Sequence, residues 1–274
     1  MRPSGGSRDR TGIVPSMFAR VPATAARRLK IAARRAISGI VSSASTAYHG
    51  RWYYSNRWHP HTALLQRALD ETVDYISSNM SDAMIKRDDI GVIDDALRRA
   101  SRDGLYLEFG VRSGRSINHI ARRRPGVTVH GFDSFEGLPE PWTGWTMERG
   151  AFGGEGIPVV EPNVRLHVGW FDDTLPRFLE DHEGHVSFVH IDSDIYSSAR
   201  TVLRGLSARL RPGSIIVFNE YFNYPNWKEH EFRAFQEFCE EFQVTYDYRS
   251  WGMYEASVEI TSITTEPRSG ESES

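Results

Sequence analysis

The sequence contains a single cysteine, Cys239, and no long apolar run. One cysteine excludes an internal disulfide framework and a zinc site built from cysteines. A membrane-spanning helix needs roughly eighteen consecutive apolar residues, and no stretch of the chain reaches that length. With 39% hydrophobic and 25% charged residues, the 274-residue chain has the composition of a soluble globular protein and room for one domain with extensions.

Acidic residues are almost absent from the amino-terminal segment. Residues 1–51 contain ten Lys or Arg and one acid, Asp9, whereas the rest of the chain carries 23 Lys or Arg and 35 Asp or Glu. Residues 16–46 place apolar side chains near helical spacing between arginines, which is typical of a basic amphipathic helix. Three alternatives stay open: peripheral contact with a membrane surface, packing on the protein itself, or an organellar presequence. Nucleic-acid binding is not expected, because Phe18 is the only aromatic residue in the basic run.

Composition divides the chain into four parts. We predict a basic, partly disordered extension (1–50), a helical region (51–100), a main domain (101–260) and a disordered polar tail (261–274). Aromatic residues are concentrated at 48–60, where they either line a ligand pocket or join the extension to the core. Within the helical region, 64–78 and 92–100 are predicted helices and 84–91 is a predicted loop.

The main domain alternates apolar strands with helical segments, which predicts an α/β fold. The predicted strands are 105–109, 127–132, 163–168, 186–191 and 213–218. The predicted helices are 115–124, 174–181, 196–210 and 228–241. Residues 244–248 and 253–260 alternate like an antiparallel hairpin. Together these segments predict a Rossmann-like sheet of seven strands, five parallel strands plus the carboxyl-terminal hairpin, flanked by helices.

The turn after the first predicted strand is a candidate ligand site. It reads Glu-x-Gly-x-x-x-Gly, with Glu108, Gly110 and Gly114 at the fixed positions. The glycines let the backbone approach a ligand closely, and the helix start that follows offers free N–H groups. A dinucleotide site would instead carry Gly-x-Gly-x-x-Gly, and an acid at the strand end would repel a pyrophosphate. An acid suits the amino group of a methionine moiety, so the turn favours S-adenosylmethionine (SAM) over NAD.

Side chains in this turn and after the second strand complete the predicted cofactor site. Asp133 ends the second strand, where a carboxylate accepts hydrogen bonds from ribose hydroxyls, and Ser134 follows it. Arg112, Ser113 and Ser116 are placed to bind the carboxylate of SAM. Ligands of an open parallel sheet bind past the carboxyl ends of its strands, so these groups are expected to meet at one edge.

The segment after the third predicted strand carries two adjacent acids, Asp172 and Asp173, preceded by Trp170 and Phe171. One of the two acids is a candidate partner for the adenine amino group of SAM, with an aromatic ring near the adenine face. The alternative is that they cap the helix that follows, because Asp is a common capping residue.

Four segments resemble the macrocin-type sugar O-methyltransferases, which are class I SAM-dependent enzymes. These segments are 108–114, 131–139, 169–176 and 190–196, within a similarity that spans about half of the chain. The motifs Asp-Ser-Phe-Glu-Gly-Leu-Pro and Asp-x-Asp-x-Tyr are the specific ones. The resemblance implies a class I methyltransferase sheet, SAM as cofactor and methylation of a sugar hydroxyl. It suggests a glycosylated natural product, a nucleotide sugar, or a glycolipid or polysaccharide as the acceptor.

The resemblance also implies a magnesium site and a general base. In that family the first Asp of Asp-x-Asp and an Asp-Asp pair after the fifth strand hold Mg²⁺, and the second Asp of Asp-x-Asp is a favoured base. Carried over, Asp192 is a metal ligand that also contacts SAM, and Asp194 is the base. The Asp-Asp-Tyr pattern is replaced here by Asn219-Glu220-Tyr221, which removes one negative charge.

This replacement leaves three alternatives for the chemistry. In the first, Mg²⁺ binds through Asp192, Asn219 and Glu220, because hard oxygen ligands suit it. In the second, methyl transfer needs no metal, and Asp194 or a histidine acts as the base. In the third, the domain is inactive and binds its ligands as a scaffold.

Residues 138–158 form a long segment with Trp142, Trp145 and several glycines, which predicts a lid over the acceptor, faced by 223–227.

The resemblance further suggests a homo-oligomer. A cytoplasmic location is expected, peripheral at the membrane if the basic segment binds a surface. Three histidines fall within predicted strands and are expected to be hydrogen-bonded core residues: His130, His167 and His190.

Overall fold

The computed structural model describes residues 59–264 and 266–267. The predicted basic extension, its membrane-surface or presequence role and nearly all of the aromatic segment 48–60 lie outside the described residues. Most of the predicted tail also lies outside them. Among the described residues, no helix has the length and apolar character needed to cross a membrane.

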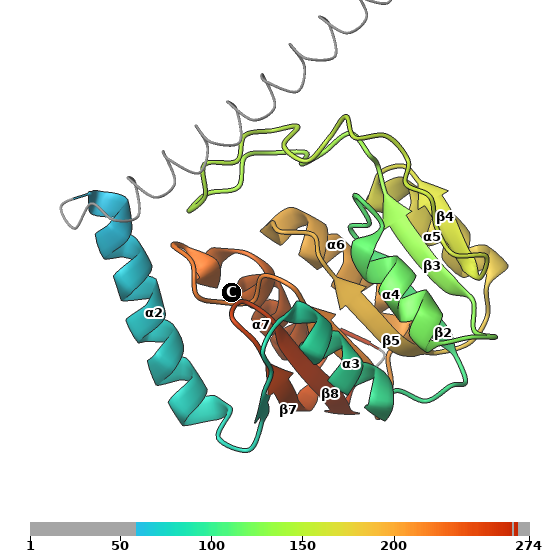
Figure 1. The fold of residues 1–274 in the computed structure, drawn as a ribbon. Helices are drawn as coiled ribbons and strands as arrows, with labels where there is room; N and C mark the ends of the chain where they lie inside the picture. Colours follow the sequence, from blue (N-terminus) through green and yellow to red (C-terminus); the bar gives the residue numbers. More distant parts are fainter. Residues whose placement is uncertain (1–58, 265, 268–274) are drawn as a thin grey trace, which may run out of the picture. The chain divides into compact units, whose positions relative to one another are not determined.

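The described residues form one eight-stranded sheet flanked by helices (Figure 1). The strands are β1 (Met84–Ile85), β2 (Leu105–Phe109), β3 (Val129–Asp133), β4 (Val164–Val168), β5 (Val186–Ile191), β6 (Ile215–Phe218), β7 (Thr245–Trp251) and β8 (Ala256–Ser262). The helices are α2 (Pro60–Asn79), α3 (Asp89–Arg99), α4 (Arg115–Arg123), α5 (Phe171–Asp181), α6 (Tyr196–Leu206) and α7 (Glu231–Glu241), with short 3-10 turns η1 (Ser207–Arg209) and η2 (Trp227–Glu229).

The strand order is β1-β7-β8-β6-β5-β2-β3-β4. Strands β2 to β6 are parallel, whereas β8 runs antiparallel to both β6 and β7. The predicted α/β fold, with five parallel strands and a carboxyl-terminal hairpin, is therefore confirmed. A sheet of this kind has its ligand crevice where the strand order reverses. Here that point lies between β2 and β5, because the chain continues from β2 to β3 on one side and from β5 to β6 on the other.

Three sequence predictions were wrong in detail. The predicted loop 84–91 contains β1, an eighth strand that pairs in parallel with β7. Met84 and Ile85 are both exposed, so this two-residue strand has no alternation that a pattern could detect. Strand β8 continues to Ser262, inside the segment predicted as a tail. The helix predicted over 196–210 ends as α-helix at Leu206 and tightens into η1.

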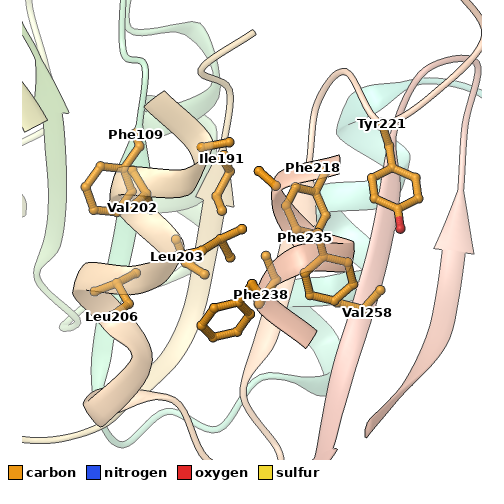
Figure 2. Packing of buried hydrophobic residues seen from close by; sticks show 14 of the residues in the cluster. Phe109, Ile191, Val202, Leu203, Leu206, Phe218, Tyr221, Phe235, Phe238 and Val258 are labelled. Atoms are coloured by element: carbon orange, nitrogen blue, oxygen red, sulfur yellow. The ribbon is translucent and has the colours of Figure 1, made fainter. Parts of the chain in front are cut away.

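Buried side chains alternate between the two faces of the sheet, as strand geometry requires. Helices α3 and α4 cover one face and α5, α6 and α7 the other (Figure 1). All six residues of β5 are buried, which is expected of a central parallel strand with both faces covered. Figure 2 shows apolar side chains of α6 and α7 packed against the sheet. The labelled ones include Val202, Leu203 and Leu206 of α6, Phe235 and Phe238 of α7, and Phe109, Ile191 and Phe218 of the strands.

Helix α2, in the region predicted as 51–100, packs against the carboxyl-terminal half of the chain. Tyr75 makes edge-on ring contacts with Trp227, Phe232 and Tyr248, and its hydroxyl lies 2.6 Å from that of Tyr248. The hydroxyl of Thr72 accepts a hydrogen bond from the backbone N–H of Asn223 at 3.0 Å. The division between residues 51–100 and 101–260 stays a prediction.

Two of the predicted core histidines lie together beneath α5. His130 is buried, and its Nδ1 lies 3.1 Å from Nε2 of His167, so the predicted hydrogen-bonded state is confirmed for this pair. Burial lowers the pKa of His130 to about 4, and the nearby His167 and His182 add to the effect. The folded state therefore holds this imidazole neutral.

This depressed pKa makes stability depend on pH. The ordinary pKa of 6.5 lies above the folded value of about 4 for His130, so the unfolded chain binds more protons between these pH values. The free energy of unfolding is expected to fall as pH falls through that window. Between pH 6.5 and pH 5, the variant His130→Gln should lose less free energy of unfolding than the wild type, as measured by urea denaturation at each pH. An equal loss in the two proteins would rule out His130 as the source of the pH dependence.

Candidate active site

A cavity of about 570 Å³ opens past the carboxyl ends of β2, β3, β4, β5 and β6. It lies at the point where the strand order reverses. Most of the predicted site residues line it: Gly110, Arg112, Ser113, Ser116, Asp133, Ser134, Asp172, Asp173, Asp192, Asp194, Asn219 and Glu220. The predicted groups that follow five strands are therefore brought together at one edge of the sheet.

The glycine turn holds the loops after β2 and β5 in close contact. Gly110 has φ +93°, and a Cβ atom built on it would lie 1.8 Å from the carbonyl oxygen of Asp192. A side chain at position 110 is thus excluded both by conformation and by space. Gly114, with φ +78°, is the N-cap of α4 and completes the turn.

Asp133 fixes the shape of the same turn from the neighbouring strand. Its Oδ2 accepts hydrogen bonds from the backbone N–H groups of Val111 (2.8 Å) and Arg112 (2.7 Å), and its Oδ1 accepts one from Phe135 (2.7 Å). One carboxylate therefore ties the loop after β2 to the loop after β3. It also lines the cavity, where the sequence predicts a contact with ribose.

Glu108 and Gly114 are the predicted cofactor-binding residues that do not line the cavity. Glu108 is fully buried on the face of the sheet covered by α4, where Ser116 donates a hydrogen bond to its Oε1 at 2.8 Å. Its Oε2 lies 3.5 Å from Nδ1 of His190. Burial alone would lower the pKa of His190, but the nearby carboxylates of Glu108, Asp192 and Glu231 together outweigh that effect and raise it to about 9. Side-chain alternation along β2 places Glu108 on the same face as Tyr106, in the core under α3 and α4, whereas Gly110 follows the end of the strand and reaches the cavity.

Three carboxylates converge in the cavity. One ligand atom each from Asp192, Asp194 and Glu220 lie within 4.8 Å of one another. Burial raises the pKa of Asp192 to about 8 and that of Asp194 to about 7, and repulsion between neighbouring carboxylates adds to both. Burial likewise raises the pKa of Glu220 well above its usual value. Such a group needs protons or a cation to offset its charge.

The residues after β6 are arranged around Glu220. The side-chain nitrogen of Asn219 donates a hydrogen bond to Oε1 of Glu220 at 2.8 Å. Oε2 of Glu220 is buried and accepts no hydrogen bond from the described residues. Asn219, a predicted metal ligand, lines the cavity and orients Glu220 through this bond. Asp194, the predicted base, lies in the close group of carboxylates with Asp192 and Glu220. Oxygen ligands of this kind suit a hard cation such as Mg²⁺.

Asp172 and Asp173 lie in the first turn of α5, exposed to solvent. The N-cap of this helix is Trp170, and no side chain makes a capping bond there. The capping alternative is therefore not supported. Both acids line the cavity beside Trp170 and Phe171, which keeps the predicted adenine contact available.

The predicted lid is anchored rather than free. Trp142 is buried, forms a bridge with Met147 and packs edge-on against Tyr224. Its ring lines the cavity, whereas residues 223–227 support the segment from behind and do not line the cavity. Nε2 of His230 lies 2.8 Å from the carbonyl oxygen of Thr143, so this histidine holds the segment in place.

Arg112 links the glycine turn to the far end of the same segment. Its Nη2 lies 3.0 Å from Oε1 of Glu155, and its guanidinium carbon lies 4.6 Å from the ring centre of Phe152. Arg112 and Phe152 both line the cavity, so the contact joins the glycine turn to this segment at the cavity wall. The sequence pattern indicated the arginine but not this pairing.

Comparison with known proteins agrees with this geometry. Residues 107–221 match a family model described as a methyltransferase domain. These residues run from β2 to just past β6, and the residues that line the cavity lie within them. A curated relative from Streptomyces olivaceus, an 8-demethyl-8-(2,3-dimethoxy-alpha-L-rhamnosyl)-tetracenomycin-C 4'-O-methyltransferase, is 29% identical over 141 residues, which are 43% of this chain and 53% of the relative. The chain thus spans about half the length of that relative.

The fold of this chain is shared with a solved structure. The calicheamicin methyltransferase CalS11 aligns with a TM-score of 0.53 and 22% identity, over 72% of this chain and 91% of CalS11. The predicted class I methyltransferase fold is confirmed by this likeness. The resemblance to sugar O-methyltransferases that the motifs indicate is confirmed by the matching domain and the curated relative.

The close approach at Gly110 has a measurable consequence. The variant Gly110→Ala forces the loops after β2 and β5 apart, because its Cβ would lie 1.8 Å from a backbone oxygen of Asp192. The free energy of unfolding is expected to drop by on the order of 3 kcal/mol or more in urea denaturation.

Gly126→Ala is the matched control for this variant. Gly126 also has positive φ, +81°, but a Cβ there would meet nothing within 4 Å. It should cost only about 1 kcal/mol of backbone strain. Similar losses for the two variants would show that conformation, and not the contact with Asp192, decides the effect.

Proposed function

We propose that this chain is a SAM-dependent O-methyltransferase that methylates a hydroxyl of a sugar-containing acceptor. The observation that carries the proposal is the convergence of Asp192, Asp194 and Glu220 in one cavity with the glycine turn of the methyltransferase domain. A cofactor turn beside a carboxylate group provides both a methyl donor site and a site that can activate a hydroxyl. The cavity volume of about 570 Å³ lies within the range of small-molecule sites.

The proposed cofactor contacts follow the predicted pattern with one change. Asp133 and Ser134 bind the ribose, and Asp172 or Asp173 binds the adenine amino group. The methionine part is bound by Arg112, Ser113, Ser116 and the backbone of the turn. All of these residues line the cavity. Glu108 acts from the core instead, by holding Ser116 and His190 beneath the turn.

The proposed chemistry uses the carboxylates in two roles. Asp192 and Glu220 would hold Mg²⁺, with the amide oxygen of Asn219 as a further predicted ligand, and the ion would lower the pKa of the acceptor hydroxyl and orient it. Asp194 accepts the hydroxyl proton as the oxygen attacks the methyl group. Its raised pKa suits a general base that works near neutral pH. The cavity walls contribute the rest of the rate enhancement, because they hold the methyl group of SAM and the acceptor hydroxyl in line for transfer.

The proposed acceptor is a glycosylated natural product. The support is the curated relative, whose name describes methylation of a rhamnosyl tetracenomycin. Trp142 and Phe152 offer aromatic surface to a sugar ring within the cavity, and Ser197 and Thr201 present hydroxyls on α6. A nucleotide sugar and a glycolipid or polysaccharide are the other acceptor classes to be screened.

The experiment is calorimetric titration of S-adenosylhomocysteine (SAH) and a methyl-transfer assay on a panel of rhamnosylated acceptors. Asp133→Ala is expected to abolish SAH binding, because it removes the carboxylate that shapes the turn. Asp181→Ala, which removes an exposed acid at the end of α5, serves as control and should bind SAH normally.

Asp194→Asn separates binding from catalysis in the same experiment. It should keep the SAH affinity and lower kcat by about 10²- to 10⁴-fold, the usual contribution of a general base. SAH binding without any methyl transfer by the wild-type protein would favour the scaffold alternative. Absence of SAH binding would overturn the methyltransferase proposal.

A further inference from the structure

Glu231, the first residue of α7, is a fully buried carboxylate behind the cavity. Its Oε1 accepts hydrogen bonds from the backbone N–H groups of Ser193 (3.0 Å) and Asp194 (3.2 Å). Its Oε2 accepts one from the backbone N–H of Glu220 (3.2 Å). One side chain therefore bonds to the loop after β5 and to the loop after β6. These are the two loops that carry the converging carboxylates.

The loop after β5 has the backbone shape that this contact requires. Asp194 has φ +65°, in the left-handed region that is strained for a residue with a side chain. Consecutive N–H groups around such a residue turn to the same side and form a concavity for an anion. Here the two N–H groups meet Oε1 of Glu231, while the side chain of Asp194 belongs to the carboxylate group in the cavity.

An acid at a helix start usually stabilises the helix through its free N–H groups. Glu231 does not serve α7 in this way, because its two oxygens are bonded to loops outside the helix. It also does not line the cavity. A carboxylate is the side chain suited to this position, since it presents two acceptor atoms and no donor to three N–H groups.

We infer that Glu231 is a positioning residue for the cation site. It holds the loops after β5 and β6 at the separation at which Asp192, Asp194 and Glu220 converge. This inference rests on the proposed function and assigns the geometry of its metal site to a residue outside the cavity. Partners that orient metal ligands from behind typically change metal affinity by about 10- to 100-fold when they are removed.

The test is calorimetric titration of Mn²⁺ alone and of SAH alone into the full chain and two variants. Glu231→Gln keeps the size of the side chain but replaces one acceptor atom with a donor, so it releases one of the two loops. Glu240→Gln, at an exposed glutamate of the same helix, is the control. We expect Glu231→Gln to weaken Mn²⁺ binding by about tenfold or more and to leave SAH affinity unchanged. The control should change neither.

Each other outcome counts against the inference. Unchanged Mn²⁺ affinity in Glu231→Gln overturns it, and a parallel loss of SAH affinity shows a general loss of structure instead of positioning. If the wild-type chain binds SAH but no Mn²⁺, the inference fails while SAM-dependent transfer survives without a metal. Binding of neither ligand overturns both. If Glu231→Gln does not fold, Glu231→Asp provides the comparison, because it keeps both acceptor atoms on a shorter side chain.

Discussion

The contact between Gly110 and the backbone of Asp192 is the constraint on which the rest of the site depends. The carbonyl oxygen of Asp192 occupies the space where a side chain at position 110 would lie. Backbone bonds extend the contact on both sides: Asp192 N–H donates to Phe109 and Gly110 N–H donates to Phe132. The ends of β2, β3 and β5 are thereby joined, and the cavity opens at their common edge.

Charge is distributed unevenly around this edge. Below the turn, Glu108 and His190 form a buried pair that offsets its own charge. Above it, Asp192, Asp194 and Glu220 converge, and Glu231 lies behind them. Burying like charges close together lowers the stability of the fold, and proteins tolerate such destabilising groups mainly at functional sites. A bound cation would offset the repulsion, so the site is expected to be tighter and more ordered with its ion than without it.

Much of this arrangement could be predicted from the sequence, because local patterns determine it. The Gly110–Gly114 turn, the parallel strands and the acids at their ends are each marked by residue type and spacing. The role of Glu108 could not be predicted, since pattern alone does not say that its side chain points into the core. The role of Glu231 could not be predicted from the sequence either. An acid in the first turn of a helix is common, and the partners of Glu231 are backbone groups of loops that are distant in sequence. The short strand β1 depends on pairing with β7 and not on its own two residues.

The most direct test of the proposed site is a crystal structure of the full chain with SAH and Mn²⁺. We expect SAH over the Gly110–Gly114 turn with its ribose at Asp133. We also expect an anomalous manganese peak bounded by oxygen atoms of Asp192 and Glu220, with Asp194 beside it. SAH bound elsewhere, or a manganese ion away from these carboxylates when SAH occupies the turn, would contradict the proposal.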